Sequence, residues 1–340
     1  MTVDEVARRS WWAVAFESAL DGGPLHARVL GEDLVIARVG GELLAAPDRC
    51  PHRGASLSGG DVVDAPDATA CLVCPYHAVH FASDGSAVHL PARPGARLPD
   101  RLSLRALPVR ARHGIVWASL DRDPVGTIPD WSEFDVDGRA RFQLGPHPWA
   151  VQASRITENF NDLAHFATVH AATFASADDT VVPPIDLRSV DGRIEHGVRM
   201  HQLDRVTLDS PEVSAEVGYR YTHVMPFASE LVITYAPDRV EWIQFAVTPT
   251  STLDPTSTDP PASMVFQQNA RDFDLDGDVG AWSDFQAEVN EEDRRVLETV
   301  RPVRIGVDGS GVDEVALGFD TFATAYRRRW RSMLGEQPGR

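Results

Sequence analysis

The chain has 340 residues, 43% of them hydrophobic, which is enough to bury the cores of about two ordinary domains. Its formal net charge is −18, and such an acidic surface argues against nucleic acid or an anionic membrane as a partner. No apolar stretch approaches the length of a membrane-spanning helix, and the apolar run after Arg8 and Arg9 ends at Glu17, too early for a signal-peptide core. We therefore expect a cytoplasmic protein.

Short strands separated by turns are expected in the first third of the chain. Gly40-Gly41 stands between two strand-like runs and predicts a β-hairpin with a two-residue turn. The expected strands are residues 34–39, 42–46 and 115–120. Turn-forming residues at 121–133 then predict a boundary, which divides the chain into domains of residues 1–125 and 126–340.

The second part is expected to combine helices with strands. A helix is predicted from Ser154 to His165 or beyond, because Ser154 suits the N-cap and Ile156, Phe160 and Leu163 recur at helical spacing. Further expected elements are strands at residues 215–225, 231–236 and 240–247, a surface loop at 249–261, and helices at 280–300 and 313–334.

The cysteines point to a metal site. An odd count of three does not suit a disulfide framework in a cytoplasmic protein. Cys50-Pro51-His52 and Cys74-Pro75-Tyr76-His77 each place a thiol and an imidazole in a turn-like loop. Two thiolates on one iron and two imidazoles on the other is the ligand set of a Rieske [2Fe–2S] centre. Neutral imidazoles also raise the potential of the cluster, which suits an electron acceptor that feeds an oxygen site.

Two other interpretations of the cysteines stay open. A structural zinc site could use Cys50, His52, Cys71 and Cys74, because Cys71 and Cys74 form a C-x-x-C pair, but it leaves His77 unexplained. Alternatively, the cysteines could be buried and inert. In the Rieske interpretation Cys71 is a spare thiol without a role.

A second constellation lies at residues 158–170. Asn159, Asp162 and His165 are spaced three apart, so on one helix they would share a face, and a buried polar stripe of this kind should face a site. His165 and His170 would lie about 140° apart around an ideal helix. They can share one metal only if the helix kinks or ends between them, and two separate core histidines remain the alternative.

These segments carry a resemblance to a known family. Residues 50–85 resemble the Rieske domain of Rieske non-haem iron oxygenases, with Ala78-Val79 standing where that family commonly has Gly-Trp. Residues 158–170 resemble its mononuclear iron motif, in which two histidines and a distant carboxylate form a facial triad with positions open for O₂. Residues 292–298 resemble the late helix that supplies the carboxylate. The resemblance implies cluster ligands Cys50, His52, Cys74 and His77 and iron ligands His165, His170 and Asp293, with Asp284 and Asp320 as alternatives to Asp293.

The resemblance also implies fold and function. It implies an α+β protein, in which an N-terminal Rieske β-sandwich domain precedes a helix-grip-like catalytic domain with a curved antiparallel sheet. The chain is similar to terminal oxygenases of the monooxygenase and O- or N-demethylase branch, such as vanillate and dicamba demethylases. Such a protein uses a [2Fe–2S] cluster, a mononuclear Fe(II), O₂ and electrons from an NAD(P)H-dependent reductase or ferredoxin. It hydroxylates or demethylates a small organic substrate, expected here to be aromatic or cyclic.

The same likeness implies a homotrimer with subunits packed head to tail. Asp162 would link His77 of the partner subunit to its own His165, and Asn159 would act beside it. Two rivals from other classes remain, namely a Rieske electron carrier without oxygenase chemistry and a zinc-stapled β-sheet binding protein. The substrate itself cannot be read from the sequence.

Overall fold

The computed structural model describes residues 2–64, 69–204, 207–208 and 213–335, which form two compact units. The first unit runs from Ala7 to Ile128, and the second begins at Pro129 and includes the N-terminal residues up to Val6. Asp4 binds in the second unit, because its carboxylate accepts the backbone N–H of Leu253 at 2.8 Å. None of the helices in the described ranges combines the length and the apolar character needed to cross a bilayer.

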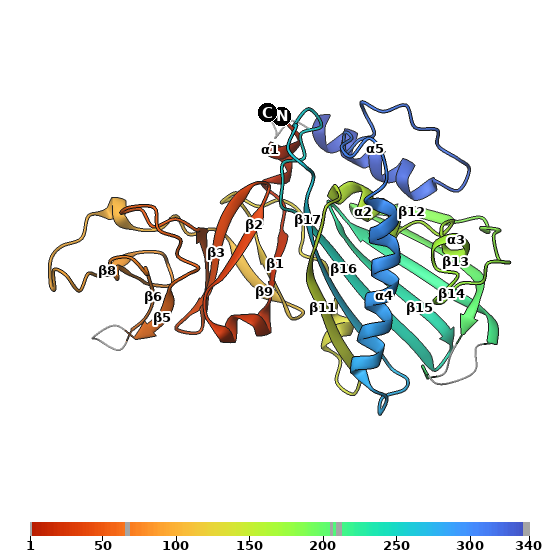
Figure 1. Ribbon diagram of the computed structural model, residues 1–340, viewed down its shortest axis with the longest axis horizontal. Coiled ribbons are helices and arrows are strands. Elements are labelled where there is room, and N and C mark those ends of the chain that lie inside the picture. The colour runs from red at the N-terminus through yellow and green to blue at the C-terminus, as the bar shows by residue number, and fades with distance from the viewer. Residues whose placement is uncertain (1, 65–68, 205–206, 209–212, 336–340) are drawn as a thin grey trace. The chain divides into compact units, whose positions relative to one another are not determined.

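The first unit consists of antiparallel strands in three small sheets, ordered β1-β10-β9, β2-β3-β4 and β5-β6-β7-β8 (Figure 1). The predicted hairpin is confirmed, since Val39 pairs with Glu42 across Gly40 and Gly41, whose φ angles of 60° and 86° need glycine. The strands are β1 Trp12–Phe16, β2 Leu25–Val29, β3 Glu32–Val39, β4 Glu42–Pro47, β5 Asp61–Asp64, β6 Ala70–Val73, β7 His80–Phe81, β8 Ala87–His89, β9 Val109–Arg112 and β10 Ile115–Ala118.

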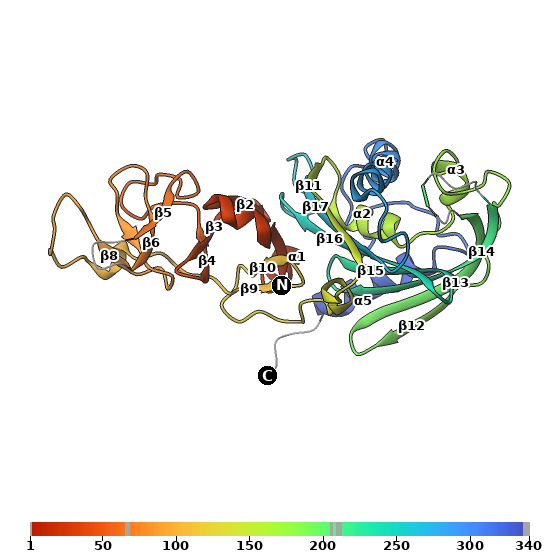
Figure 2. The same cartoon turned by 90° about the horizontal axis from the view of Figure 1, so that it is seen from below.

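A seven-stranded antiparallel sheet forms the second unit, in the order β11-β17-β16-β15-β14-β13-β12. Its strands are β11 Ala140–Trp149, β12 Asp186–Val190, β13 Arg193–Asp204, β14 Val213–Val224, β15 Ala228–Ala236, β16 Arg239–Pro249 and β17 Ser263–Arg271. The sheet is curved, and the helices α2, α3 and α4 lie on its concave side (Figure 2). The helices are α1 Val3–Ala7, α2 Ala153–Phe160, α3 Phe166–Val169, α4 Val279–Leu297 and α5 Thr321–Gly335.

Helix α4 begins where the side chain of Asp278 accepts the backbone N–H groups of Gly280 and Ala281. Its residues Phe285, Val289 and Asp293 follow one another at intervals of four, so they share a face. That face lines the same cavity as the concave side of the sheet. The predicted helix at residues 280–300 is thus confirmed with an earlier start and end.

The prediction of one helix from Ser154 to His165 is wrong. Helix α2 ends at Phe160, and its N-cap position is Gln152. The side-chain amide of Asn161 donates to the carbonyl of Thr157 at 2.9 Å and so occupies an acceptor that a continuing helix would use. Asp162 then accepts the backbone N–H groups of Ala164 and His165, which starts a new turn that leads into α3.

Two further element predictions need correction. The last helix begins at Thr321, so residues 313–320, which were expected to be helical, form an irregular segment before α5. The long strand β13 was not predicted, because its buried alternating positions include His196, Gln202 and Asp204 beside apolar residues. Polar residues on the inner face hide the two-residue period that indicates a strand.

Candidate metal centres

Three side chains meet in the second unit at ligand distance. Nε2 of His165 lies 3.2 Å from Nε2 of His170, and each of these atoms lies 3.3 Å from Oδ1 of Asp293. Ligands at about 2.1 Å from one ion and at right angles to each other would be about 3.0 Å apart, so one ion fits the triangle. Two histidines and one carboxylate in this arrangement are the facial triad typical of non-haem iron.

The break in the helix is what brings His165 and His170 together. Asn159 lies on α2, Asp162 in the turn after it, and His165 directly before α3, so these residues do not line one helix face as predicted. The chain turns between α2 and α3, and both imidazoles then meet Asp293 from α4. Their spacing of five residues was therefore compatible with a shared ion only because the helix ends early.

Each histidine is oriented by a carboxylate at its other nitrogen. Nδ1 of His165 lies 2.8 Å from Oδ2 of Asp162, and Nδ1 of His170 lies 2.8 Å from Oε2 of Glu292. The hydroxyl of Thr173 donates to the same oxygen of Glu292 at 2.9 Å. A carboxylate that accepts the Nδ1–H leaves the Nε2 lone pair for the metal and makes the imidazole a better ligand.

Sequence reasoning missed the role of Glu292. It stands next to Asp293 in an acidic helix, and that position alone does not distinguish it from Glu291, which forms salt bridges with Arg294 and Arg295 on the surface. The alternatives for the third ligand lie elsewhere. Asp284 is exposed, and Asp320 accepts the backbone N–H of Leu317 at 2.6 Å.

The pKa values reflect the close approach of these groups. Burial alone would lower the pKa of His165, but hydrogen bonds with Asp162 and Asp293 raise it to about 9. Burial would likewise raise the pKa of Asp293, yet the two imidazoles hold it well below its ordinary value. Asn159 adds a hydrogen bond from Nδ2 to Oδ1 of Asp293 at 3.2 Å. The arrangement therefore attracts positive charge to the point where the three ligand atoms meet.

In the first unit, the two Cys/His loops share one backbone pattern. The N–H of Cys50 donates to Ala55 and its carbonyl accepts from Gly54, and the N–H of Cys74 donates to Val79 and its carbonyl accepts from Ala78. Gly54 and Ala78 hold equivalent places with φ of 77° and 52°. Both thiols are buried, whereas His52 and His77 are exposed with ring centroids 4.6 Å apart.

This arrangement does not suit a single zinc ion. Tetrahedral ligands of one zinc lie within about 4 Å of each other. Across the described ranges, only His165, His170 and Asp293 form a group of three or more possible ligands within 4.8 Å, so Cys50, His52, Cys71 and Cys74 form no such cage. Burial and the neighbouring Cys74 thiol raise the pKa of Cys50, while N–H groups of His52 and Arg53 oppose the rise.

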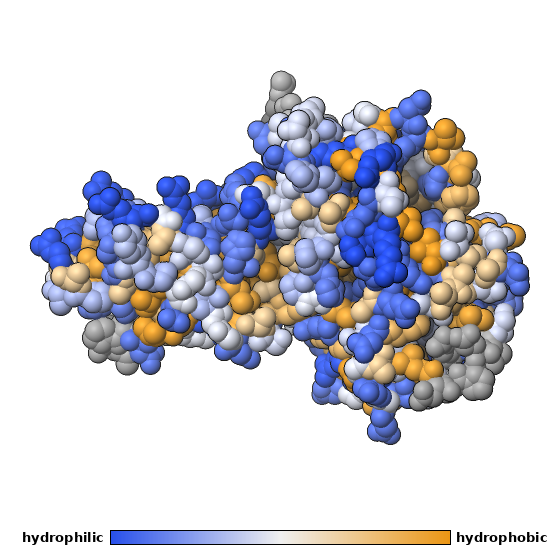
Figure 3. All heavy atoms as spheres, viewed as in Figure 1, coloured by the Kyte–Doolittle hydropathy of each residue, from blue (hydrophilic) through white to orange (hydrophobic). Residues whose placement is uncertain are grey.

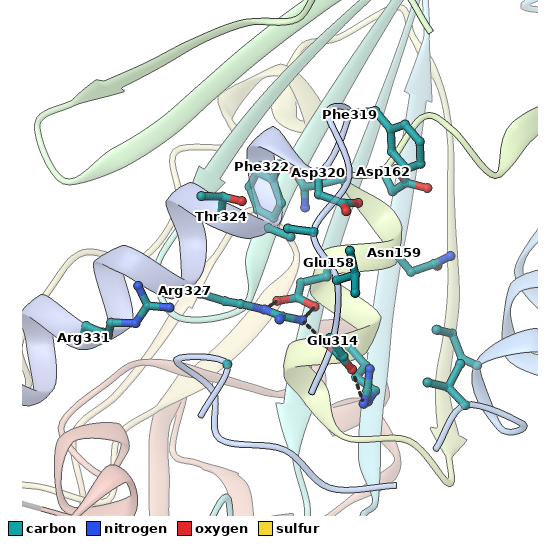
Figure 4. A pocket seen from close by; sticks show the side chains of 18 residues that line it. Glu158, Asn159, Asp162, Glu314, Phe319, Asp320, Phe322, Thr324, Arg327 and Arg331 are labelled. Atoms are coloured by element: carbon teal, nitrogen blue, oxygen red, sulfur yellow. Dashed lines mark hydrogen bonds and ion pairs between the residues drawn. The ribbon is translucent and has the colours of Figure 1, made fainter. Parts of the chain in front are cut away.

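Two cavities border α2. One, of about 80 Å³, is lined by the three candidate ligands and by aromatic and aliphatic side chains, among them Phe174, Tyr221 of β14 and Ile243 of β16. The other is a larger hollow of about 720 Å³ between α2, α5 and the segment before α5. Figure 4 shows Asp162 and Asn159 on its wall, with the ion pairs of Arg327 nearby. Asp162 thus faces this hollow while it holds His165.

Both halves of the chain match known protein families. Residues 10–107 match the Rieske [2Fe-2S] domain, and residues 149–336 match the vanillate O-demethylase oxygenase C-terminal domain. Methylxanthine N1-demethylase NdmA of Pseudomonas putida is 29% identical over 97% of this chain and 90% of its own. The dicamba O-demethylase oxygenase component of Stenotrophomonas maltophilia is 34% identical over 48% of each chain. The solved structure of NdmB from Pseudomonas putida CBB5 aligns with a TM-score of 0.81 and 25% identity over 97% of this chain and 92% of its own.

Fold, site and relatives together define a Rieske-type oxygenase, an oxidoreductase that carries a [2Fe–2S] cluster and a mononuclear non-haem iron. More than half of the chain matches the vanillate O-demethylase oxygenase domain, so the chain belongs to that family. The predicted family, fold class, enzyme class and cofactors are confirmed. Several relatives are named as oxygenase components or as a subunit of a monooxygenase system, so they work with separate partners.

Proposed function

We propose that the chain is a terminal oxygenase that removes a methyl group from nitrogen or oxygen of a small aromatic or cyclic compound. The observation that carries this proposal is the group of His165, His170 and Asp293 in a cavity with aromatic walls. An ion held on one face by these three ligands would keep positions open for O₂, beside a cavity that can receive the substrate. Family membership supports demethylation, because relatives that cover most of the chain are named demethylases.

We assign the cluster to Cys50, His52, Cys74 and His77. The buried thiols suit the inner iron, and the exposed imidazoles suit the outer iron that exchanges electrons. Cys71 is fully buried on β6, and its Sγ lies 3.5 Å from the carbonyl of Thr69. In this assignment it is a core side chain and not a ligand.

Different side chains have different roles at the proposed iron site. The bound iron supplies the oxidative chemistry that places one oxygen atom of O₂ in a C–H bond of the substrate. Asp162 and Glu292 hold the imidazoles with Nε2 toward the ion, and Asn159 fixes the carboxylate of Asp293. The apolar walls orient the substrate and exclude water. When the oxidised carbon is a methyl on nitrogen or oxygen, the hydroxymethyl product breaks down to formaldehyde and the demethylated compound.

We further propose that electrons enter through the hollow that Asp162 faces, from the cluster of the partner subunit in a homotrimer. Val315, Leu317 and Phe319 are exposed on the segment before α5 and support a contact there. Figure 3 shows hydrophobic surface in the region where that segment runs in Figure 1. Tyr76, 64% exposed beside His77, would be the matching apolar side chain at the cluster tip. The first electron donor would be an NAD(P)H-dependent reductase or a ferredoxin, and the cytoplasm remains the expected location.

The iron content of Asp293→Ala tests the function. This variant should lose the mononuclear iron and all formaldehyde release, because a triad cannot spare one ligand, and should keep the visible absorption of the cluster. Asp284→Ala, on the exposed side of the same helix, is the matched control and should keep both. Full iron content in Asp293→Ala would contradict the assignment, and a wild type with no mononuclear iron would favour a simple electron carrier.

Asp162→Asn separates electron delivery from oxygen chemistry. An amide has one acceptor oxygen and a nitrogen that only donates, so it cannot offer His165 and a second imidazole an oxygen each, as a carboxylate can. NADH-driven turnover should fall nearly to zero, while product formation with hydrogen peroxide, which supplies oxygen and electrons together, should persist. An equal loss in both assays with iron still bound would mean that Asp162 shapes the iron site and does not bridge the centres.

A further inference from the structure

The cavity that holds the triad has a polar wall as well as an apolar one. Gln202 of β13, Tyr219 of β14 and Glu241 of β16 all line it. Tyr219 pairs across the sheet with Ile233, which pairs with Glu241, so Tyr219 and Glu241 lie in one row, whereas Gln202 pairs with Ala215, four residues before Tyr219. None of them takes part in holding the proposed iron ligands. Their position makes them candidates for contact with the substrate.

Two atoms of this wall lack a hydrogen-bond partner among the described residues. They are Oε1 of Gln202 and the hydroxyl of Tyr219, and each residue is 3% exposed. A buried polar atom without a partner costs about 1–3 kcal/mol, so such atoms are normally satisfied by a bound molecule or an ordered water. An amide oxygen can only accept, which means that the missing group opposite Gln202 is a hydrogen-bond donor.

Glu241 adds further accepting capacity. Its Oε1 accepts from Asn269 at 2.9 Å and its Oε2 from the hydroxyl of Tyr235 at 3.2 Å. Each carboxylate oxygen can accept one more hydrogen bond. Burial raises the pKa of Glu241, against the opposing effect of these two donors and of the neighbouring Arg271. The guanidinium of Arg271 stacks on Trp282 and lies outside the residues that line the cavity.

The lining also restricts the charge of the occupant. Among the described residues around the cavity there is no arginine, the whole chain has no lysine, and the only histidines are the two proposed iron ligands. A carboxylate group buried against Gln202 and Glu241 would have no side-chain counter-charge, which is unfavourable in a dry site. The volume of about 80 Å³ and the rings of Phe174 and Tyr221 favour a compact, flat molecule.

We propose that Gln202 and Glu241 determine specificity by accepting N–H groups from a flat ring compound that carries no negative charge, and that they exclude aromatic carboxylates. This inference rests on the proposed function in one respect, namely that the substrate occupies the cavity at the triad. Tyr219 completes the polar wall and can donate to an oxygen or accept from a nitrogen on the same ring.

A matched pair of probes tests this recognition. 4-Methoxybenzamide and 4-methoxybenzoate share the ring and the methyl ether, and differ in an amide that donates N–H groups against a carboxylate anion. Calorimetric titration of the anaerobic holoprotein measures binding without turnover. The wild type should bind the amide at least about tenfold more tightly than the carboxylate, since an unpaired buried charge is costly.

Three variants sharpen the measurement. Gln202→Leu should weaken binding of the amide by about tenfold and leave binding of the carboxylate unchanged, because leucine is similar in size to glutamine but has no acceptor oxygen. Glu241→Gln, which replaces an acceptor oxygen by a donor, should reduce the amide preference by about tenfold. Gln143→Leu on β11, outside the cavity lining, is the control and should bind like the wild type. Thermal unfolding and the cluster absorption verify that each variant is folded.

The proposal is overturned if the amide does not bind the wild type, if the carboxylate binds as tightly, or if the first two variants leave the ratio unchanged. Formaldehyde release from the bound amide is measured separately with reductant and O₂. A clear amide preference without formaldehyde would uphold the recognition and contradict the proposed demethylation of this probe. Formaldehyde release from the carboxylate alone would support demethylation and refute the recognition.

Discussion

Substitutions at Glu292 should weaken iron binding, and the loss should be larger when no acceptor oxygen remains for Nδ1 of His170. Oε2 of Glu292 lies 2.8 Å from Nδ1 of His170 and accepts the hydroxyl of Thr173 at 2.9 Å. Glutamine keeps an oxygen there but loses the charge, which roughly halves the strength of such a hydrogen bond. Alanine leaves the imidazole N–H without an acceptor in a site where His170 is almost completely buried.

The expected size of the effect follows from other metal sites, in which the residues that hydrogen-bond to ligating histidines have been substituted. Loss of a carboxylate that orients a ligating histidine typically costs about 10- to 100-fold in metal affinity, or about 1.4–2.8 kcal/mol. We expect Glu292→Gln near the lower limit and Glu292→Ala near the upper. Glu291→Gln and Glu291→Ala are the matched controls, because Glu291 stands next in the sequence but pairs with surface arginines.

The assay is a competition for Fe(II) between the iron-depleted protein and a chromogenic chelator under anaerobic conditions. The cluster belongs to the first unit, so its absorption measures the protein concentration independently of the mononuclear site. An affinity of Glu292→Ala equal to that of Glu291→Ala would refute the reasoning, since it would show that His170 needs no carboxylate to hold its orientation.

Three further predictions concern the cluster loops and the core of the second unit. Cys74→Ser should lose the cluster and its colour, whereas Cys71→Ser should keep both, and bleaching of the latter would refute the ligand assignment. Ala78→Gly should stabilise the first unit by about 0.5–1 kcal/mol in chemical unfolding, because Ala78 has a φ of 52°, where glycine has no side-chain penalty. Burial lowers the pKa of His196 to about 4 and of His223 to about 3, the latter also through His196. Between about pH 4 and pH 6.5 these two histidines are therefore protonated in the unfolded chain but not in the native chain. Together they should lower stability by about 3 kcal/mol at pH 5.5 relative to pH 7.5, and His223→Gln should remove roughly half of that contribution.

Local patterns were sufficient for the predictions that depend on neighbouring residues. The hairpin at Gly40-Gly41 follows from two residues that accept positive φ, and the Cys/His pairs each lie within four residues of chain. Asp293 is different, because the sequence offered many acidic residues and only the family resemblance favoured this one. The spacing of Asn159, Asp162 and His165 suggested a helix face, but the side chain of Asn161 ends the helix first.

The features that escaped prediction depend on contacts between distant parts of the chain. Glu292 meets His170 across 122 residues, and Asn159 meets Asp293 across 134. Gln202 and Glu241 line one cavity only because β13, β14, β15 and β16 lie side by side in the sheet. Nothing in the sequence near Glu292, Gln202 or Glu241 distinguishes them from other polar residues on a strand or an acidic helix, so their positions at the site appear only when the sheet and α4 are assembled.

The two metal sites therefore place different demands on the fold. Each cluster loop is closed by its own backbone hydrogen bonds, between Cys50 and Ala55 in one case and between Cys74 and Val79 in the other, so its shape is local. The proposed iron site has no such local closure, because two of its ligands, His165 and His170, flank α3, while the third and the carboxylate of Glu292 come from α4. A small shift of α4 against the sheet would move Asp293, Glu292 and the cavity-lining Val289 together. Substitutions along the inner face of α4 should thus change iron affinity and substrate fit jointly, while leaving the cluster untouched.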